Sequence, residues 1–383
     1  MIRFAYLKWK LGNNHNIFIK NVEGLRLVMQ GNFECIYQYQ PLWGKWQVDE
    51  LIGAGNFGKV YRVSNEEFGH TYTSAVKIIS IPLDNQYTET ESLIGTNKGT
   101  LRNYFHEMVQ SLVNEVNILY SLSGNSNILG YHDHKIIEHK DKVGWDILIR
   151  MEFVKPLSKY LTEKQMTREE VIMLGIDMCS ALDICSKHGI IHRDIKEQNI
   201  FINEDRIFKL GDFGIAMKLY KSGWTASMRG TPHYMAPEVY HGDKYNSLVD
   251  IYSLGIVLYK LFNHGRLPIM PPYPEAFDSD DSKKALEKRM NGGQFQMPDQ
   301  AGEALAKVIM KACAYKAENR YSSPIMMKRD LEKALNGLSY VSRNEFVTIL
   351  DNEATEKNAV KLGHDPDSTN ISTTRNDIPF SFT

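Results

Sequence analysis

The sequence predicts an α+β fold with two lobes, a small antiparallel β-sheet followed by a mainly helical unit. From Trp46 to about Ile81, alternating apolar residues interrupted by glycines are typical of strands. After Pro156, apolar residues recur at the spacing of helices instead. The chain has 383 residues, of which 43% are hydrophobic, and is therefore long enough to bury a substantial core across two lobes.

The first lobe is expected to contain a hairpin, a buried strand, a helix and a second strand pair. Glycines separate the first two strands, and the compact apolar run 75–79 forms the next one. The polar stretch 82–100 is predicted to be a loop before a helix over residues 101–122. Further strands are expected over residues 131–139 and 145–153.

The second lobe is expected to be helical. Thr167 and Glu170 have the spacing of a capping box, and the helix that they begin should end at Gly189. An apolar, largely buried helix is expected over residues 250–262, with further helices near 299–315 and 323–335. Residues 339–383 are rich in Asn, Asp and Thr and are predicted to form a tail without fixed structure.

Residues 1–43 form an N-terminal extension whose apolar residues show no steady period. Two interpretations remain open. The extension packs on the main domain, or it includes sequence upstream of a true start at Met29.

Composition and charge exclude several classes of protein. The formal net charge of -1 gives no field of a single sign, so nucleic acid is not an expected partner. The four cysteines are scattered without the spacing of a metal finger or of a disulfide framework. No apolar run reaches the roughly 20 residues that span a bilayer, and the first residues lack the basic-then-apolar pattern of a secretory signal. We therefore expect no membrane span and a cytoplasmic location.

Two acids, an amide and a lysine are concentrated in one short region. Asp194, Lys196 and Asn199 belong to the run 192–199, and Asp212 follows after a short strand-like stretch. Phosphoryl transfer from ATP requires magnesium ligands, a positive clamp and a group that orients the attacking hydroxyl. The residue types in this region can supply each of these parts.

The glycine run predicts a hairpin that covers phosphates. Its G-x-G-x-x-G spacing alone is a weak signal, because dinucleotide-binding folds use it at the start of a helix. Here a strand follows the last glycine, so the run is expected to form a hairpin turn whose backbone amides cover phosphates. A hairpin without a ligand is the alternative for the glycines alone, and the downstream Lys77 favours phosphate binding. The residues of this run are Gly53, Ala54, Gly55, Asn56, Phe57 and Gly58.

Lys77 lies inside an apolar strand, where an unpaired ammonium would cost several kcal/mol of desolvation free energy. A phosphate and a helix carboxylate are the expected partners. Glu115 is the candidate carboxylate, ahead of Glu107 two turns earlier. A solvated helix face remains the alternative for Glu115.

Taken together, these motifs resemble those of the eukaryotic-like (Hanks-type) serine/threonine protein kinases, and a bacterial member is expected. The resemblance covers about residues 44–338 and implies a bilobal protein kinase-like fold, with lobes 44–153 and 154–338, that uses ATP and Mg2+. The motifs that carry it are the glycine run, Lys77, His192-Arg193-Asp194, Asp212-Phe213-Gly214, the segment 230–238, Asp250 and Arg320.

The resemblance also implies residue roles. Asp194 would orient the substrate hydroxyl and accept its proton, and Lys196 would steady the γ-phosphate. Asn199 and Asp212 would hold magnesium, which prefers such oxygen ligands. Lys77 and Glu115 would form the paired clamp, although the stretch between them is longer than in most relatives.

An adenine site is implied as well. Small and apolar side chains would enclose the ring, the backbone of the hinge 152–154 would pair with its edge, and a gatekeeper would lie behind it. Beside the glycine run and Lys77, the implied nucleotide-binding residues are Ile52, Val60, Ala75, Met151, Glu152, Val154 and Phe201.

Lys196 and Thr231 imply a preference for serine and threonine over tyrosine. Arg193 next to the base could pair with a phosphate, so Thr225 and Ser227 are expected activation sites. Protein substrates and a transient homodimer for autophosphorylation in trans are the expected partners. Two alternatives remain, a small-molecule phosphotransferase and an ATP-binding pseudokinase scaffold.

Overall fold

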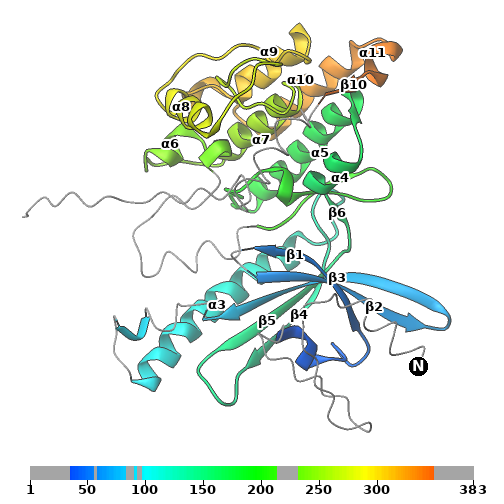
Figure 1. Ribbon diagram of the computed structural model, residues 1–383, viewed down its shortest axis with the longest axis vertical. Coiled ribbons are helices and arrows are strands. Elements are labelled where there is room, and N and C mark those ends of the chain that lie inside the picture. The colour runs from blue at the N-terminus through cyan, green and yellow to red at the C-terminus, as the bar shows by residue number, and fades with distance from the viewer. Residues whose placement is uncertain (1–34, 56–57, 83–89, 93–96, 214–231, 349–383) are drawn as a thin grey trace, which may run out of the picture.

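The computed structural model describes residues 35–55, 58–82, 90–92, 97–213 and 232–348. Figure 1 shows a lobe built on an antiparallel sheet and a second lobe built mainly of helices. The predicted α+β, two-lobed fold is therefore confirmed.

Five antiparallel strands form the sheet of the first lobe, in the order β1-β2-β3-β5-β4. The central strand β3 is buried from Ser74 to Ile79 because both faces of the sheet are covered there. The second strand pair was predicted and is confirmed. The strands are β1 (Gln47–Gly55), β2 (Gly58–Glu67), β3 (His70–Ile81), β4 (Tyr131–Glu138) and β5 (Trp145–Met151).

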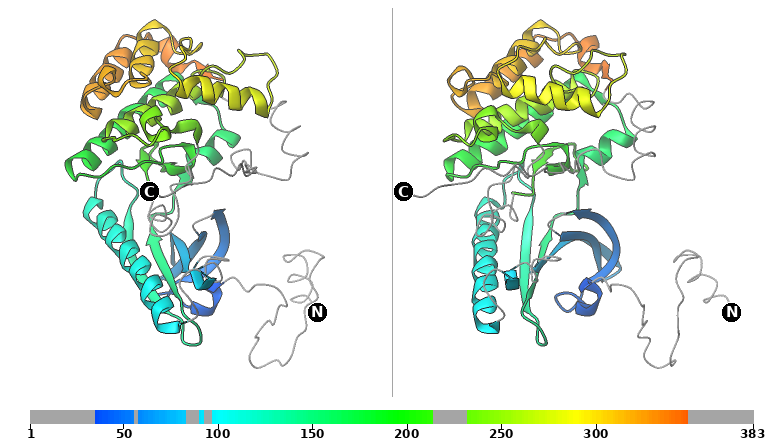
Figure 2. Two further views of the ribbon diagram at one scale, coloured as in Figure 1. Left: turned by 90° about the vertical axis from the view of Figure 1, so that its left-hand side faces the viewer. Right: turned by 60° about the vertical axis from the view of Figure 1, so that its left-hand side comes forward.

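The long helix α3 (Lys98–Leu122) covers one face of the sheet, as the views in Figure 2 show. It begins before the predicted residue 101, because the Asn97 side chain accepts hydrogen bonds from the amides of Gly99 and Thr100 and so caps the first turn. Apolar side chains of α3, β3 and β5 form a shared core, which includes Phe105, Leu112, Ile79 and Ile147.

The N-terminal segment 35–46 covers the opposite face of the sheet. The short 3-10 helix η1 (Cys35–Tyr39) places Ile36 against the sheet, and Leu42 and Trp46 follow it into the same core. Residues 35–43 of the expected extension therefore pack on the first lobe. Met29 lies outside the described residues.

The second lobe is organised around α5 (Arg168–Lys187) and α7 (Leu248–Leu261), which contact each other in its core. The predicted capping box is present, since the Thr167 hydroxyl accepts from the Glu170 amide and the Glu170 carboxylate accepts from the Thr167 amide. The other helices are α4 (Leu157–Glu163), α6 (Pro237–Tyr240), α8 (Ser279–Met290), α9 (Glu303–Ala312), α10 (Pro324–Asn336) and α11 (Tyr340–Asn344), with η2 (Glu197–Asn199), η3 (Pro232–Tyr234) and η4 (Ala317–Asn319).

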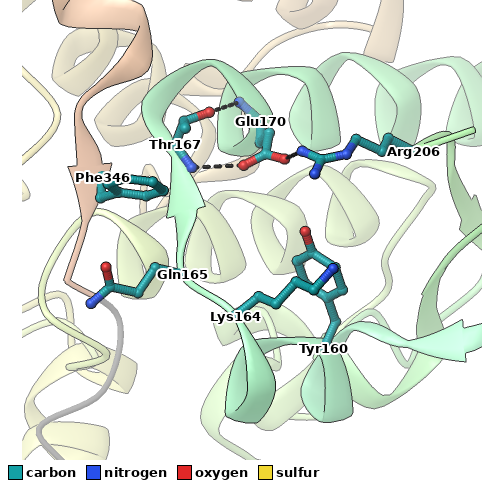
Figure 3. Close-up of a pocket in the computed structure, with 7 residues that line it drawn as sticks. All are labelled: Tyr160, Lys164, Gln165, Thr167, Glu170, Arg206 and Phe346. Atoms are coloured by element: carbon teal, nitrogen blue, oxygen red, sulfur yellow. Dashed lines mark hydrogen bonds and ion pairs between the residues drawn. The ribbon is translucent and has the colours of Figure 1, made fainter. Parts of the chain in front are cut away.

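Residues 340–347 differ from the tail that the sequence predicted. After α11, the strand β10 (Phe346–Val347) pairs with β7 (Met166–Thr167). The side-chain amide of Gln300 donates to the carbonyl oxygen of Thr348 and accepts a hydrogen bond from the Thr348 backbone amide. Local polarity did not reveal this pairing, because its partners lie far away in the sequence. A surface cavity of about 440 Å³ lies beside it (Figure 3), lined by Tyr160, Lys164, Gln165, Thr167, Glu170, Arg206 and Phe346.

A three-stranded sheet lies where the lobes meet. It contains β6 (Lys155–Pro156), β8 (Ile200–Ile202) and β9 (Phe208–Leu210). Strand β8 directly follows the segment that carries Asp194, Lys196 and Asn199, and β9 ends two residues before Asp212. Within the described ranges, no helix has both the length and the apolar character needed to cross a membrane.

Candidate active site

Two expected catalytic residues and one expected magnesium ligand form a single polar group. The Asn199 side-chain amide donates to the carbonyl oxygen of Asp194 at 2.7 Å and to its Oδ2 at 2.8 Å. The ammonium of Lys196 lies 3.2 Å from the same Oδ2. These contacts fix the Asp194 carboxylate in one orientation. Because the side-chain nitrogen of Asn199 makes both hydrogen bonds, the side-chain oxygen of Asn199 is left to coordinate a cation.

Asp250 holds this loop from the apolar helix α7. Its carboxylate accepts the backbone amides of His192 at 2.8 Å and Arg193 at 2.9 Å. Burial raises the pKa of Asp250, and the positive charges and amides around it oppose that rise only in part. Arg193 has a φ of 70°, a backbone conformation that a residue of this size rarely adopts without tertiary contacts to hold it.

Lys77 and Asp212 form the ion pair of the site. Lys77 Nζ lies 2.5 Å from Asp212 Oδ1, and Lys77 is only 8% exposed. Burial alone would raise the pKa of Asp212, but the charge and hydrogen bond of Lys77, with the charges of His192 and Lys196, lower it overall. The Asp212 carboxylate is therefore ionised at neutral pH, next to where phosphates and magnesium would bind.

The predicted pair of Lys77 with Glu115 is not tested by the structure. Glu115 belongs to α3, but its side chain lies outside the described residues. The alternative, Glu107, is exposed. The sequence assigned Asp212 to magnesium alone and missed its contact with Lys77, because 135 residues separate the two.

The glycine turn joins β1 and β2, so the prediction that a strand follows it is confirmed. Gly58 has a φ of 132°, and a Cβ built there would lie 2.2 Å from the carbonyl oxygen of Ile78. Close packing against β3 therefore requires a glycine at this position, whatever the turn binds. Asn56 and Phe57 lie outside the described residues.

The strand register brings four of the expected nucleotide-binding residues to one face of the sheet. Val60 pairs with Lys77, and Ala75 pairs with Met151. Directly opposed residues share a face, and so do residues two apart on one strand, so all four lie on the same face. Phe201 lies in β8 of the other lobe, at the lobe junction.

An ion pair ties the hinge to the strand before Asp212. The Glu152 carboxylate accepts the Gly130 amide at 3.1 Å and lies 3.0 Å from Lys209 Nζ in β9. Lys209 comes three residues before Asp212, and the sequence did not indicate its role. Val154 is half-buried in the same hinge, and Ile52 is partly exposed on β1.

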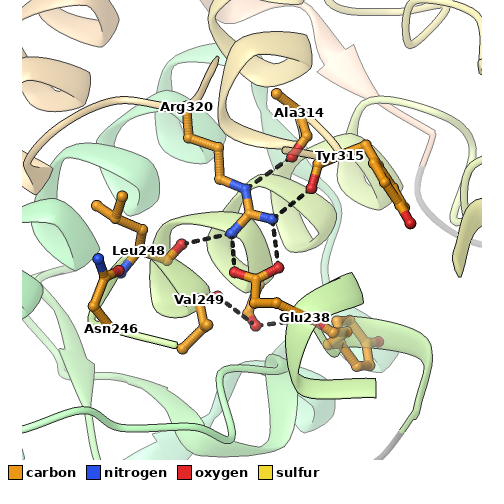
Figure 4. A network of polar contacts seen from close by, with 9 residues as sticks. Glu238, Asn246, Leu248, Val249, Ala314, Tyr315 and Arg320 are labelled. Carbon is orange, nitrogen blue, oxygen red and sulfur yellow. Dashed lines mark hydrogen bonds and ion pairs between the residues drawn. The ribbon is translucent and has the colours of Figure 1, made fainter. Parts of the chain in front are cut away.

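A buried arginine fixes the end of the expected substrate segment (Figure 4). Arg320 makes a double hydrogen bond to the Glu238 carboxylate, at 2.6 and 2.8 Å. It also donates to the carbonyl oxygens of Ala314, Tyr315 and Leu248. The first residues of α6 are thereby attached to the core of the second lobe.

The expected regulatory residues are described only in part. Thr225, Ser227 and Thr231 lie outside the described residues. Arg193 is exposed, and its guanidinium lies 5.6 Å from the centre of the Tyr245 ring. Its pairing with a phosphate stays a prediction.

Comparison with known proteins identifies the family. Residues 46–331 match the model of the protein kinase domain, and the chain belongs to the protein kinase family. It is 31% identical over 275 residues to the probable serine/threonine-protein kinase nek2 of Dictyostelium discoideum, which covers 69% of this chain and 57% of that protein.

Bacterial kinases are similar as well. The chain is 34% identical over 185 residues to the serine/threonine-protein kinase PknB of Mycobacterium tuberculosis. The aligned residues make up 46% of this chain and 28% of PknB. A probable serine/threonine-protein kinase of Clostridium acetobutylicum is 28% identical over 320 residues, or 81% of this chain and 43% of that protein. The chain therefore matches less than two thirds of the length of each of these relatives.

Proposed function

We propose that this protein is a serine/threonine protein kinase that transfers the γ-phosphate of Mg-ATP to hydroxyl groups of proteins. The observation that carries the proposal is the group formed by Asp194, Lys196 and Asn199, which Asp250 anchors from α7. A carboxylate fixed by an amide and an ammonium is suited to orient a hydroxyl beside a phosphate.

Each charged residue has a distinct part in the transfer. Asp194 accepts a hydrogen bond from the substrate hydroxyl and takes its proton as the phosphate is transferred. Lys196 and Lys77 place positive charge beside the phosphates, where negative charge is concentrated. Asp212 and Asn199 offer oxygen atoms that fit magnesium, which neutralises phosphate charge when bound. Val60, Ala75, Met151, Phe201 and the hinge would enclose adenine.

The names of the relatives support serine and threonine as acceptors. Protein substrates, a cytoplasmic location and transient pairing of two copies for phosphorylation of Thr225 or Ser227 belong to the same proposal. A small-molecule phosphotransferase is less well supported. The segment 230–238 is the one that contacts protein substrates in kinases of this kind, and Arg320 fixes its last residue, Glu238. A scaffold that only binds ATP is disfavoured by the intact set of charged residues.

The test is incubation of the purified chain with Mg-ATP and a generic basic protein, beside Asp194→Asn. Loss of a positioned base should reduce the rate by about 10²–10⁴. Phosphoserine or phosphothreonine on either protein, found by mass spectrometry and lost in the variant, supports the proposal. ATP binding without any transfer to protein would contradict it.

A further inference from the structure

Arg150 connects the N-terminal segment 35–46 to the edge of the proposed adenine site. It precedes Met151 on β5, and alternation along a strand places the two side chains on opposite faces of the sheet. Met151 shares its face with Lys77. Arg150 therefore lies on the other face. The N-terminal segment covers that face of the sheet, opposite α3 (Figure 2).

Two aromatic rings hold the Arg150 side chain. Its guanidinium lies 4.7 Å from the centre of the Trp46 ring and 5.6 Å from that of Trp43. The same group makes a double hydrogen bond to the Asp133 carboxylate, at 3.0 and 2.7 Å. A guanidinium is well suited to this, since it can stack on rings and pair with a carboxylate at once.

The Asp133 contact lies at a β-bulge. Arg150 is opposite Asp133 and Met151 is opposite Tyr131, so His132 is the extra residue of β4. Bulges change the direction of a strand locally. The Arg150–Asp133 pair therefore fixes the bulge directly beside Met151, at the point where β5 leads into the hinge.

The turn that carries the tryptophans is itself tightly held. Leu42 and Trp46 exchange backbone hydrogen bonds at 2.8 and 2.9 Å. Trp43, inside this turn, has a φ of 48°, which is unusual for a bulky residue and is retained only where packing enforces it. Trp43 lies before the residues 46–331 that match the kinase domain model. Its contact with Arg150 therefore involves a residue outside that match.

We propose that Arg150 is a positioning residue for ATP, and that Trp43 and Trp46 act through it on Met151 and the hinge. The inference rests on the proposed ATP site. Its consequence is that the N-terminal segment contributes to nucleotide affinity although it lies on the face of the sheet away from the nucleotide.

The test compares Arg150→Met, Arg150→Lys, Trp46→Leu and Trp43→Leu in the full chain. The KM for ATP and for a generic basic protein, kcat, ADP affinity by calorimetry and the melting temperature are measured for each. Arg102→Gln is the control, because Arg102 also pairs with a β4 carboxylate, that of Glu138, but on the exposed surface.

We expect Arg150→Met and Trp46→Leu to raise the KM for ATP about three- to tenfold and to weaken ADP binding equally, with kcat and the KM for the protein changed less than about twofold. Arg150→Lys should recover part of the loss, because an ammonium keeps the charge over the rings but cannot make the double hydrogen bond. Trp43→Leu removes the less buried ring and keeps the test valid if Trp46→Leu does not fold.

A KM for ATP within about twofold of the unchanged chain in every folded variant would overturn the inference. So would an equal effect of Arg102→Gln. Lys77→Met separates this failure from failure of the proposed function. If Lys77→Met stays fully active, the nucleotide binds elsewhere and both are overturned; if it is inactive, a negative result concerns Arg150 alone.

Discussion

Lys77 Nζ lies 2.5 Å from Oδ1 of Asp212, and this contact joins the central strand of the first lobe to a residue two positions after the end of β9 in the second. Asp212 adopts a φ of 52°, so the chain turns sharply here and brings the carboxylate to the ammonium. The pair connects the proposed phosphate clamp to a proposed magnesium ligand, and two predictions concern it directly.

Lys77→Met should abolish most phosphate transfer. The change removes a preorganised positive charge from the phosphates and leaves Asp212 without its partner, and loss of one such group typically lowers kcat by about 10²–10³. Initial rates at saturating ATP measure the effect. Lys45→Met is the matched control, because Lys45 pairs with Glu67 on the exposed surface; it should retain full activity.

The stability cost of Lys77→Met should depend on pH. Lys77 is a main reason why the pKa of Asp212 is below its ordinary value of 3.8. A depressed carboxylate pKa contributes stability above the unfolded pKa, and this contribution is lost as pH falls through the folded pKa. Without Lys77, the pKa of Asp212 should rise, because the charge and hydrogen bond that lower it most are lost, so the ionised form no longer gains this stabilisation.

The difference in the free energy of unfolding between the unchanged chain and Lys77→Met should therefore be largest near pH 7 and decrease toward pH 4. Urea unfolding at a series of pH values measures it. In an Asp212→Asn background, the effect of Lys77→Met should no longer vary with pH over this range. A constant difference with Asp212 present would show that the pair does not control this titration.

Residues with local signals were predicted well from the sequence. Thr167 and Glu170 are three residues apart, and their capping box depends only on that spacing. The hairpin around Gly58 was distinguished from a helical glycine motif because a strand-like run follows it. The apolar helix that carries Asp250 was also found from its composition.

Long-range contacts were not predicted. The Lys209 pair with Glu152 and the stack of Trp46 on Arg150 each join residues that no local pattern relates. Asn97 was read as part of a loop, although its side chain caps α3. Each of these interactions either joins residues far apart in the sequence or depends on a single side chain. The spacing of apolar residues along the chain therefore does not predict it.

Gly58→Ala should destabilise the first lobe even without nucleotide. The added Cβ would collide with the carbonyl oxygen of Ile78, and the positive φ disfavours any L side chain. Gly55→Ala is the matched control, because a Cβ there meets nothing within 4 Å. Gly58→Ala should lower the melting temperature, whereas Gly55→Ala should leave it unchanged within error and affect only the KM for ATP. Equal melting temperatures would contradict this account of Gly58.

Arg320→Met should be among the most destabilising substitutions in the second lobe. Arg320 is fully buried, and its removal leaves the Glu238 carboxylate and three carbonyl oxygens without their donor. Breaking a buried pair of this kind costs about 3–5 kcal/mol. Glu238→Gln should cost less, because an amide oxygen still accepts from the guanidinium. Thermal unfolding of both variants checks the order, and a reversed order would show that the carbonyl contacts matter little.

Val347→Asp should destabilise the protein, whereas Phe346→Asp should not. The two neighbours lie in β10, but Val347 is buried and Phe346 is 65% exposed. A charge at residue 347 must either be buried without a partner or detach β10 from β7 and Thr348 from Gln300. The loss of stability cannot exceed what residues 340–348 contribute to the folded protein, because the segment can detach. We therefore expect the melting temperature to fall by a few degrees. Equal melting temperatures for both variants would show that residues 340–348 behave as the free tail that composition predicted, while a drop for Val347→Asp alone would place the end of the folded unit beyond residue 338.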